Sequence, residues 1–398
     1  MHQLDFNGAT LETGTKTPWS EQWKVRLERW LSHPALYRFA ISNPFTRWFA
    51  QRRTQQVFDL MAGFVHSQVL LSCTRLGLFG LLRENAMSMQ ELAHRVNVAP
   101  AALQRLVFAA VSLRLLAFRH NQTIGLGPLG VPIAAHAGIQ AMIEHNQLLY
   151  QDLHDPVAFL NHAWSGSMAE YWPYAHEAGQ ESTRQASDER VSRYSALMAA
   201  SQNFVIQEIL SSYNFSDHRC ILDVGTGMGR FISELGSKQT HLQLQLFDLP
   251  PVLHLARQTL AEHQLLDRAS FFPGSFTEDV LPQGADLITL VRVAHDHPDV
   301  VVKQLLRKAF DALPVGGALL IAEPMASEPN EPPLGDAYFH YYLLAMGAGR
   351  LRTPSEIGEL MAQAGFSLIE LVPNPMPIHA RLIVGRKLSV YPNIGPDK

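Results

Sequence analysis

Residues 220–229 have the sequence CILDVGTGMG, in which a run typical of a buried strand leads directly into a glycine-rich turn. Further strand patterns follow, and helical patterns such as residues 300–313 lie between them. These strands are expected at residues 242–247, 270–272, 287–291, 318–322 and 378–384. Alternation of strands and helices predicts a doubly wound α/β sheet. We therefore expect a Rossmann-like α/β domain over residues 216–388 and a short tail over residues 389–398.

The turn after the first strand carries three glycines, Gly225, Gly227 and Gly229. Glycines allow a tight turn and let a ligand approach the backbone without a Cβ in the way. Arg230 stands where the dinucleotide fingerprint requires a glycine. Asp223, just before the turn, would repel a pyrophosphate and instead suits a cationic ligand. The turn therefore predicts a nucleoside ligand other than NAD.

Two later segments extend this ligand site. Asp248 ends the second strand, where a carboxylate accepts hydrogen bonds from ribose hydroxyls, and Leu249 follows it. Gly274, Ser275 and Phe276 follow the third strand, where an adenine can lie against the phenylalanine ring. Two acids and an aromatic around a glycine turn predict S-adenosylmethionine, whose ammonium and sulfonium charges match the acidic lining.

The predicted chemistry lies in residues 291–298, VRVAHDHP, directly after the fourth strand. His295 is the candidate general base, because histidine accepts a proton near neutral pH. We expect Asp296 to orient this loop, Arg292 to hold the cofactor and Glu323, which ends the fifth strand, to fix the imidazole. A histidine that only caps or fills the core is the alternative. Adjacent side chains point apart, so no metal site is expected here.

The N-terminal half predicts a winged helix over residues 59–130, with helices followed by two short strands at 116–118 and 123–126. A DNA-reading helix needs several cations, and the second helix offers only Arg105 and Arg114. The net charge of −4 also argues against nucleic acid. We therefore expect a dimerisation platform, followed by a helical connector with substrate-pocket helices over residues 131–215.

Residues 1–58 form an N-terminal arm, of which residues 1–18 are polar and expected to be disordered. From residue 19 on, the arm alternates aromatic and basic residues. The aromatic ones are Trp19, Trp23, Trp30, Tyr37, Phe39, Phe45, Trp48 and Phe49. Short helices of this composition suit a membrane interface. A helical arm that packs on this protein or on a second subunit is the equal alternative.

Composition bounds the class of protein. Charged residues make up 17% of the 398 residues, below the roughly 25% of an average globular protein, which favours an apolar partner. Two cysteines, Cys73 and Cys220, exclude a disulfide scaffold and fit a reducing compartment. No signal peptide is recognisable, and the apolar stretch 57–82 contains charged residues that argue against a spanning helix. We expect a cytoplasmic protein, with peripheral membrane contact through the arm.

The motifs together resemble the small-molecule O-methyltransferases of the plant caffeate and animal acetylserotonin type. The matching segments are residues 222–229, 247–250, 273–276, 292–296, 321–324, 352–353 and 364–366. The resemblance implies a class I fold that uses S-adenosylmethionine and a homodimer formed through the winged helix. It also implies that Asp248 contacts ribose, that Ser275 and Phe276 line the adenine, that Arg292 contacts the cofactor and that His295 is the base.

The sequence departs from that family at two positions. Ser275 replaces a usual aspartate, and Leu351 replaces a glutamate that helps to hold the histidine in the plant members. Glu323 is then the only orienting carboxylate that the resemblance supplies.

Segments 58–71, 125–130, 142–145 and 171–175 are similar to the bacterial carotenoid O-methyltransferases, the demethylspheroidene and hydroxyneurosporene enzymes. This resemblance implies conversion of the C-1 tertiary hydroxyl of an acyclic carotenoid into a methoxy group, in spheroidene and spirilloxanthin synthesis. One alternative is a methyltransferase for another apolar acceptor, such as a bacteriochlorophyll-type ring or a polyketide or phenol hydroxyl. A non-enzymatic alternative is a winged-helix regulator that senses S-adenosylmethionine.

Overall fold

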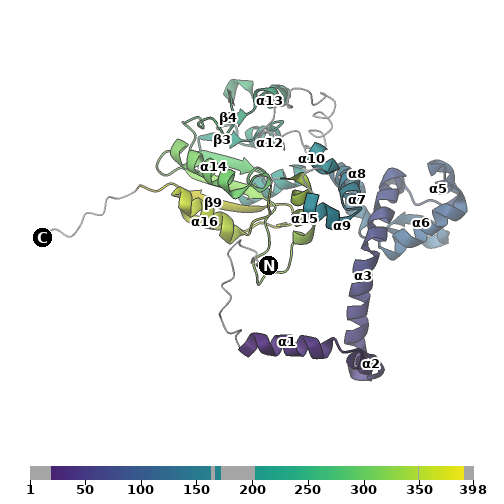
Figure 1. The fold of residues 1–398 in the computed structure, drawn as a ribbon. Helices are drawn as coiled ribbons and strands as arrows, with labels where there is room; N and C mark the ends of the chain where they lie inside the picture. Colours follow the sequence, from purple (N-terminus) through teal and green to yellow (C-terminus); the bar gives the residue numbers. More distant parts are fainter. Residues whose placement is uncertain (1–18, 163–165, 172–201, 348, 390–398) are drawn as a thin grey trace.

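The computed structural model describes residues 19–162, 166–171, 202–347 and 349–389. A helical N-terminal part lies beside a C-terminal α/β domain, and the helical segment of residues 19–58 extends away from both (Figure 1). The expectations for residues 1–18, for most of the 389–398 tail and for residues 172–175 of the carotenoid-enzyme motif fall outside the described residues.

The α/β domain is built on a seven-stranded sheet with the strand order β5-β4-β3-β6-β7-β9-β8. Its strands are β3 (Cys220–Val224), β4 (Gln243–Asp248), β5 (Ala269–Pro273), β6 (Leu287–Val291), β7 (Ala318–Glu323), β8 (Ser367–Val372) and β9 (Arg381–Arg386). The first five are parallel, and β9 runs antiparallel to both β7 and β8. The chain order reverses between β3 and β6, and sheets of this kind bind ligands outside the carboxyl ends of the strands at such a point.

The far edge of the sheet differs from the sequence prediction. Strand β8 was not expected, and β9 begins at Arg381 rather than at residue 378. His379 donates its backbone N–H to the carbonyl oxygen of Met376, so residues 376–379 form a turn that contains Pro377 instead of a strand. The register of β8 shifts within the strand, and Leu368 has a φ of 48°. An edge strand with a bulge carries little periodic signal.

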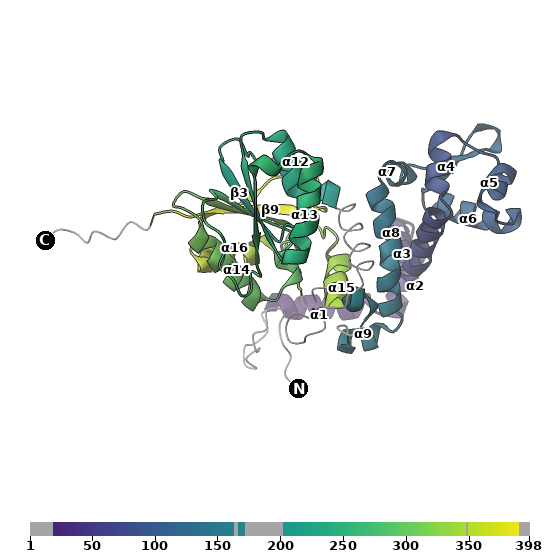
Figure 2. The ribbon, with the colours of Figure 1, turned by 90° about the horizontal axis from the view of Figure 1, so that it is seen from above.

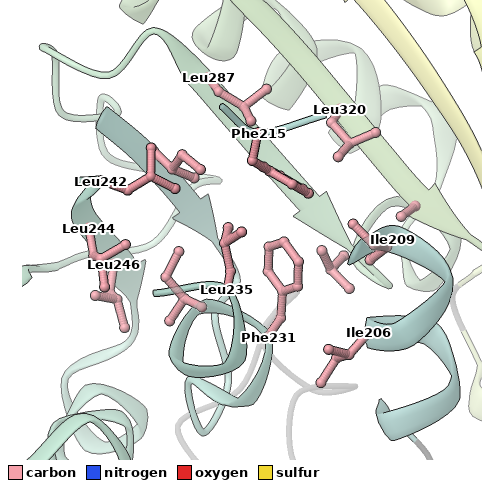
Figure 3. Packing of buried hydrophobic residues seen from close by; sticks show 14 of the residues in the cluster. Ile206, Ile209, Phe215, Phe231, Leu235, Leu242, Leu244, Leu246, Leu287 and Leu320 are labelled. Atoms are coloured by element: carbon pink, nitrogen blue, oxygen red, sulfur yellow. The ribbon is translucent and has the colours of Figure 1, made fainter. Parts of the chain in front are cut away.

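Helices cover both faces of the sheet, as the view from above shows (Figure 2). Helices α12 (Arg230–Lys238) and α13 (Pro250–Glu262) lie on one face, and α14 (Asp299–Ala312) and α16 (Pro354–Ala364) on the other. On the first face, Phe231 and Leu235 pack against Phe215 and against Ile206 and Ile209 of a further helix (Figure 3). Burial on both faces explains why the central strands are continuous apolar runs.

The N-terminal part contains the predicted winged-helix elements. They are α4 (Leu78–Glu84), α5 (Met89–Val96), α6 (Pro100–Ser112), β1 (Leu116–Phe118), the short helix η1 (His120–Gln122) and β2 (Ile124–Leu126). A buried apolar cluster of its own holds them together. The connector then adds α7 (Gly130–Ala135), α8 (Ala137–Asp152), α9 (Pro156–His162) and α10 (Ser167–Tyr171). Helix α15 (Asp336–Met346) of the C-terminal domain packs against α8 and α10.

The arm consists of α1 (Trp19–Leu31), α2 (Pro34–Ser42) and the first half of α3 (Pro44–Arg75). Helix α3 continues without a break across the expected boundary at residue 58. Among the described residues, α3 alone is long and apolar enough to span a membrane, with a mean hydropathy of 1.3 over its best 18 residues, of which 22% are buried. This test rests on length and composition only, so the prediction that residues 57–82 do not span a membrane stays a prediction.

Candidate active site

The glycine turn after β3 has the left-handed backbone that only glycine adopts without strain. The φ angles of Gly225, Gly227 and Gly229 are 70°, 57° and 72°. A Cβ at Gly225 would lie 2.8 Å from Cγ2 of Val293, whereas one at Gly227 would meet no protein atom within 4 Å. The turn therefore touches the segment after β6 on one side and leaves room for a ligand beside Gly227.

Asp248 ties this turn to the next strand. Its Oδ2 accepts the backbone N–H of Gly227 at 2.8 Å, and its Oδ1 accepts that of Leu249 at 2.7 Å. The carboxylate is therefore held in one orientation at the end of β4. Each carboxylate oxygen accepts two hydrogen bonds, which is the capacity that a ribose diol requires.

Asp223 lies near the carboxyl end of the adjacent strand β3 and is almost completely buried, with 2% of its surface exposed. Thr289 on the neighbouring strand β6 donates its hydroxyl to Oδ1 at 2.6 Å. Burial raises the pKa of Asp223 to about 6, and the charge of Asp248 adds to this shift. A positively charged ligand near these two carboxylates would favour the ionised form of Asp223.

The turn after β5 lies beside Asp248. Gly274 donates its backbone N–H to the carbonyl oxygen of Asp248 at 3.0 Å, and Ser275 donates its own to Oδ2 of Asp279 at 2.9 Å. The Phe276 ring meets that of His297 edge-on at 5.1 Å. The structure thereby brings the predicted adenine segment next to the histidine-bearing turn.

His295 lies in the short helix η5 (Ala294–Asp296) and is 3% exposed. Oε2 of Glu323 accepts the backbone N–H of His295 at 3.0 Å and lies 3.3 Å from Nδ1 of its ring. Oδ1 of Asp296 lies 3.2 Å from Nε2. Glu323 is 1% exposed, so the imidazole is fixed on its Nδ1 side by a buried carboxylate. Glu323 favours a proton on Nδ1, whereas Asp296 favours one on Nε2, so Nε2 offers a lone pair to an acceptor only when the Asp296 carboxylate has moved away.

Arg292, directly after β6, has a φ of 57°, an unusual value for a residue with a side chain. Its backbone N–H binds the carbonyl oxygen of Ala322 at 2.9 Å. Burial lowers the pKa of His145 on α8 to about 4, and the charge of Arg292 adds to this shift. The same charge opposes the rise in the pKa of Tyr338 on α15, which burial brings to about 12. The charge of Arg292 thus acts on His145 of α8 and Tyr338 of α15, and its contact with the cofactor stays a prediction.

Sequence reasoning missed four groups around this site. His145 lies 3.3 Å from the Tyr342 hydroxyl, and Tyr338 donates its hydroxyl to Asn146 at 2.9 Å. Lys308 on α14 donates to the carbonyl oxygen of Phe276 at 2.8 Å. The fourth group, Arg352, is fully buried against the His295 turn. Of these groups, Arg352 and His145 had a sequence signal, Arg352 in the segment 352–353 and His145 in the segment 142–145 of the resemblances.

Comparison with known proteins identifies the family of this chain. A family model for the O-methyltransferase domain matches residues 150–367, and one for the O-methyltransferase dimerisation domain matches residues 58–127. The chain belongs to the O-methyltransferase family. The enzymes of this family take their methyl group from S-adenosylmethionine, and the buried and half-buried carboxylates around the glycine turn fit such a cation. A regulator without activity is not favoured.

Individual O-methyltransferases are similar over most of the chain. The demethylspheroidene O-methyltransferase of Cereibacter sphaeroides is 38% identical over 88% of this chain and 91% of its own. That of Rhodobacter capsulatus is 39% identical over 85% of this chain and 82% of its own. Human N-acetylserotonin methyltransferase, solved in complex with S-adenosylmethionine, has the same fold, with a TM-score of 0.68 at 22% identity over 85% of this chain and 98% of its own.

Proposed function

We propose that this O-methyltransferase methylates the C-1 tertiary hydroxyl of an acyclic carotenoid in spheroidene or spirilloxanthin synthesis. The observation that carries the acceptor is the similarity, over more than four fifths of each chain, to two enzymes named for demethylspheroidene. The low fraction of charged residues in the whole sequence and the aromatic and basic residues of the arm agree with a substrate that resides in a bilayer. Neither of these two relatives is named for a ring or phenol acceptor.

Residues at the carboxyl ends of β3, β4 and β5 would hold the cofactor. Gly225, Gly227 and Gly229 shape the turn, and Asp248 would accept the ribose hydroxyls. The other residues in this proposed set are Asp223, Leu249, Gly274, Ser275, Phe276 and Arg292. When bound, S-adenosylmethionine supplies an activated methyl group on a sulfonium, and the buried Asp223 provides the compensating negative charge. All of them lie at the carboxyl ends of the neighbouring strands β5, β4, β3 and β6, beside the strand-order reversal, and this position supports the set.

His295 would remove the acceptor proton through Nε2 while the oxygen–methyl bond forms and the methyl–sulfur bond breaks. An alcohol is too weak an acid to ionise beforehand, so the proton leaves during transfer. Glu323 holds Nδ1 and stabilises the imidazolium that results. Asp296 lies where the acceptor hydroxyl would approach Nε2, so the acceptor would displace this carboxylate from the ring. A tertiary hydroxyl is crowded, which makes alignment the main requirement.

We further propose that the protein is a homodimer that lies peripherally on an anionic membrane, with the arm at the lipid surface. Trp19, Trp23 and Trp30 on α1 are 76%, 54% and 59% exposed. The arm projects from the rest of the molecule (Figure 1). Arg52 stacks over Trp48, which pairs a cation with an aromatic ring as at a headgroup layer. The arm's six arginines and one lysine between residues 24 and 53 favour anionic lipid.

The direct test is methyl transfer. The purified full chain is incubated with methyl-labelled S-adenosylmethionine and a panel of C-1-hydroxylated acyclic carotenoids, chlorophyllides and phenols presented in vesicles. We expect label in the methoxy group of the carotenoids only. Label in a chlorophyllide or a phenol with none in the carotenoids would overturn the proposed acceptor.

A further inference from the structure

Among the residues that the structure describes, Arg352 is the largest fully buried side chain, and it lies against the turn that carries His295. Its Nη1 donates to the carbonyl oxygen of Ala294 at 2.9 Å, and its Nη2 donates to that of His297 at 2.7 Å. These carbonyls lie on either side of His295. The planar guanidinium therefore grips both ends of the turn at once, which a single ammonium cannot do.

The positive charge of Arg352 is balanced by the carboxylate of Asp299. Its Nε donates to Oδ1 of Asp299, the first residue of α14, at 2.9 Å. Arg350 binds the same carboxylate with Nε at 3.0 Å and Nη2 at 3.1 Å but touches no carbonyl of the His295 turn. The two arginines thus share one ionic partner and differ in their contact with the turn. The side chain of Asp299 is 41% exposed, so its pair with Arg352 is partly screened by solvent and contributes little net stability.

The turn is also enclosed from a second side. A Cβ at Gly349 would lie 2.1 Å from the carbonyl oxygen of His295 and 2.9 Å from Cα of Asp296. Only a glycine fits there without displacing the turn. Leu351, between these two positions, is buried and apolar and gives the imidazole no carboxylate. The backbone of the turn is therefore held by Arg352 and Gly349, and the ring by Glu323.

We propose that Arg352 is a positioning residue for His295: its guanidinium fixes the two carbonyls of the turn and so holds Nε2 in line with the acceptor hydroxyl. This inference rests on the proposed role of His295 as the base. Displacement of a reacting group by about 1 Å costs up to about 100-fold in rate. Loss of the grip should therefore lower kcat and leave the binding of the cofactor unchanged.

The test compares Arg352→Lys with Arg350→Lys in the full-length enzyme. Both variants keep a cation beside Asp299, but only the first loses the paired contacts with the turn. We expect kcat to fall about 10- to 100-fold for Arg352→Lys, with the acceptor KM and the Kd of S-adenosylhomocysteine within about twofold of wild type. Arg350→Lys should keep kcat within about twofold. Equal kcat values for the two variants would overturn the proposal.

Two further measurements separate positioning from folding. In a His295→Ala background, Arg352→Lys should cause no additional loss of kcat, because the group that it positions is gone. An equal loss in both backgrounds would overturn the proposal. Gly349→Ala disturbs the turn without touching the charge and should also lower kcat, whereas Gly358→Ala on α16 should not. Unchanged activity of Gly349→Ala would count against the proposal even if Arg352→Lys failed to fold.

Different results would refute the role of His295 as the base and the positioning role of Arg352. If His295→Ala alone retains the wild-type kcat, the proposed base is wrong. If His295→Ala loses activity while Arg352→Lys and Gly349→Ala do not, the base stands and the positioning role of Arg352 is wrong.

Discussion

The carboxyl ends of the central strands and the N-terminal arm depart from ordinary folding rules in opposite ways. At the carboxyl ends of these strands, three titratable groups are almost completely buried, namely Asp223, His295 and Glu323. In the arm, Phe45 and Trp19 are large apolar groups that are 89% and 76% exposed. Buried charge and exposed apolar surface both cost free energy in a lone, dissolved protein. The two departures are explained together if the first region binds a charged cofactor and the second a lipid surface.

The largest effect is expected from His295→Ala. Without the base, kcat should fall about 10²- to 10⁴-fold, while the Kd of S-adenosylmethionine, measured by calorimetry, stays nearly unchanged. His254→Ala, which removes an exposed histidine on α13, is the control and should keep the wild-type kcat. A wild-type rate for His295→Ala would leave the buried imidazole as a packing group.

The next effect concerns Asp248. Its replacement by alanine removes a charged acceptor from the proposed ribose contact and frees the turn at Gly227, so cofactor affinity should fall about 100-fold. Calorimetry against Asp267→Ala, an exposed acid in the short helix η4 (Leu266–Arg268), measures this difference. Equal affinities for the two variants would reject the ribose role.

A smaller effect tests the arm. Trp23→Gln with Trp30→Gln removes two exposed rings, each of which buries about 40 Å² in an interface, or about 1 kcal/mol. Partition onto phosphatidylcholine–phosphatidylglycerol vesicles should fall about thirtyfold. Binding of the wild type should also weaken as salt is raised. The control variant, Val280→Gln with Val315→Gln, alters two residues that are 83% and 65% exposed elsewhere.

The outcome also separates the two partners considered for the arm. If the tryptophan variant loses dimerisation in sedimentation and keeps its vesicle binding, the arm is a subunit contact and the membrane proposal is wrong.

The smallest effect is a pH dependence from Asp223. Burial raises its pKa from 3.8 to about 6, so its contribution to folding is greatest below pH 3.8 and is lost as the pH rises through 6. A cationic cofactor favours the ionised form, so its binding releases a proton at lower pH. Affinity should fall about tenfold between pH 7.5 and pH 5. Asp223→Asn should remove this dependence, and a persistent slope in that variant would reassign it to another group.

Strong local patterns predicted much of the fold. Strands β6 and β7 begin at the expected residues, because a continuous apolar run identifies a buried strand without reference to its partners. Strand β8 was missed because its exposed, bulged pattern depends on pairing with β9. The expected boundary at residue 58 was placed where the composition changes. Helix α3 continues past it because a change in composition does not end a helix.

In the candidate site, too, local patterns predicted some residues, and residues that act through distant contacts were missed. Asp248, His295 and Glu323 were found because each ends or follows a predicted strand. Arg352 escaped because its role lies in two backbone carbonyls that are more than 50 residues away in the chain. Lys308, whose ammonium binds the loop after β5 from a helix on one face of the sheet, escaped for the same reason. Contacts to backbone atoms leave no residue pattern in the partner sequence.

The most direct measurement is a crystal structure of the protein with S-adenosylhomocysteine and a hydroxylated carotenoid analogue. We predict that both ribose hydroxyls lie on Asp248, that the sulfur faces Nε2 of His295 across the acceptor oxygen, and that Asp296 has moved away from that nitrogen. A nucleoside bound away from the glycine turn, or a His295 ring directed away from the acceptor, would contradict the account.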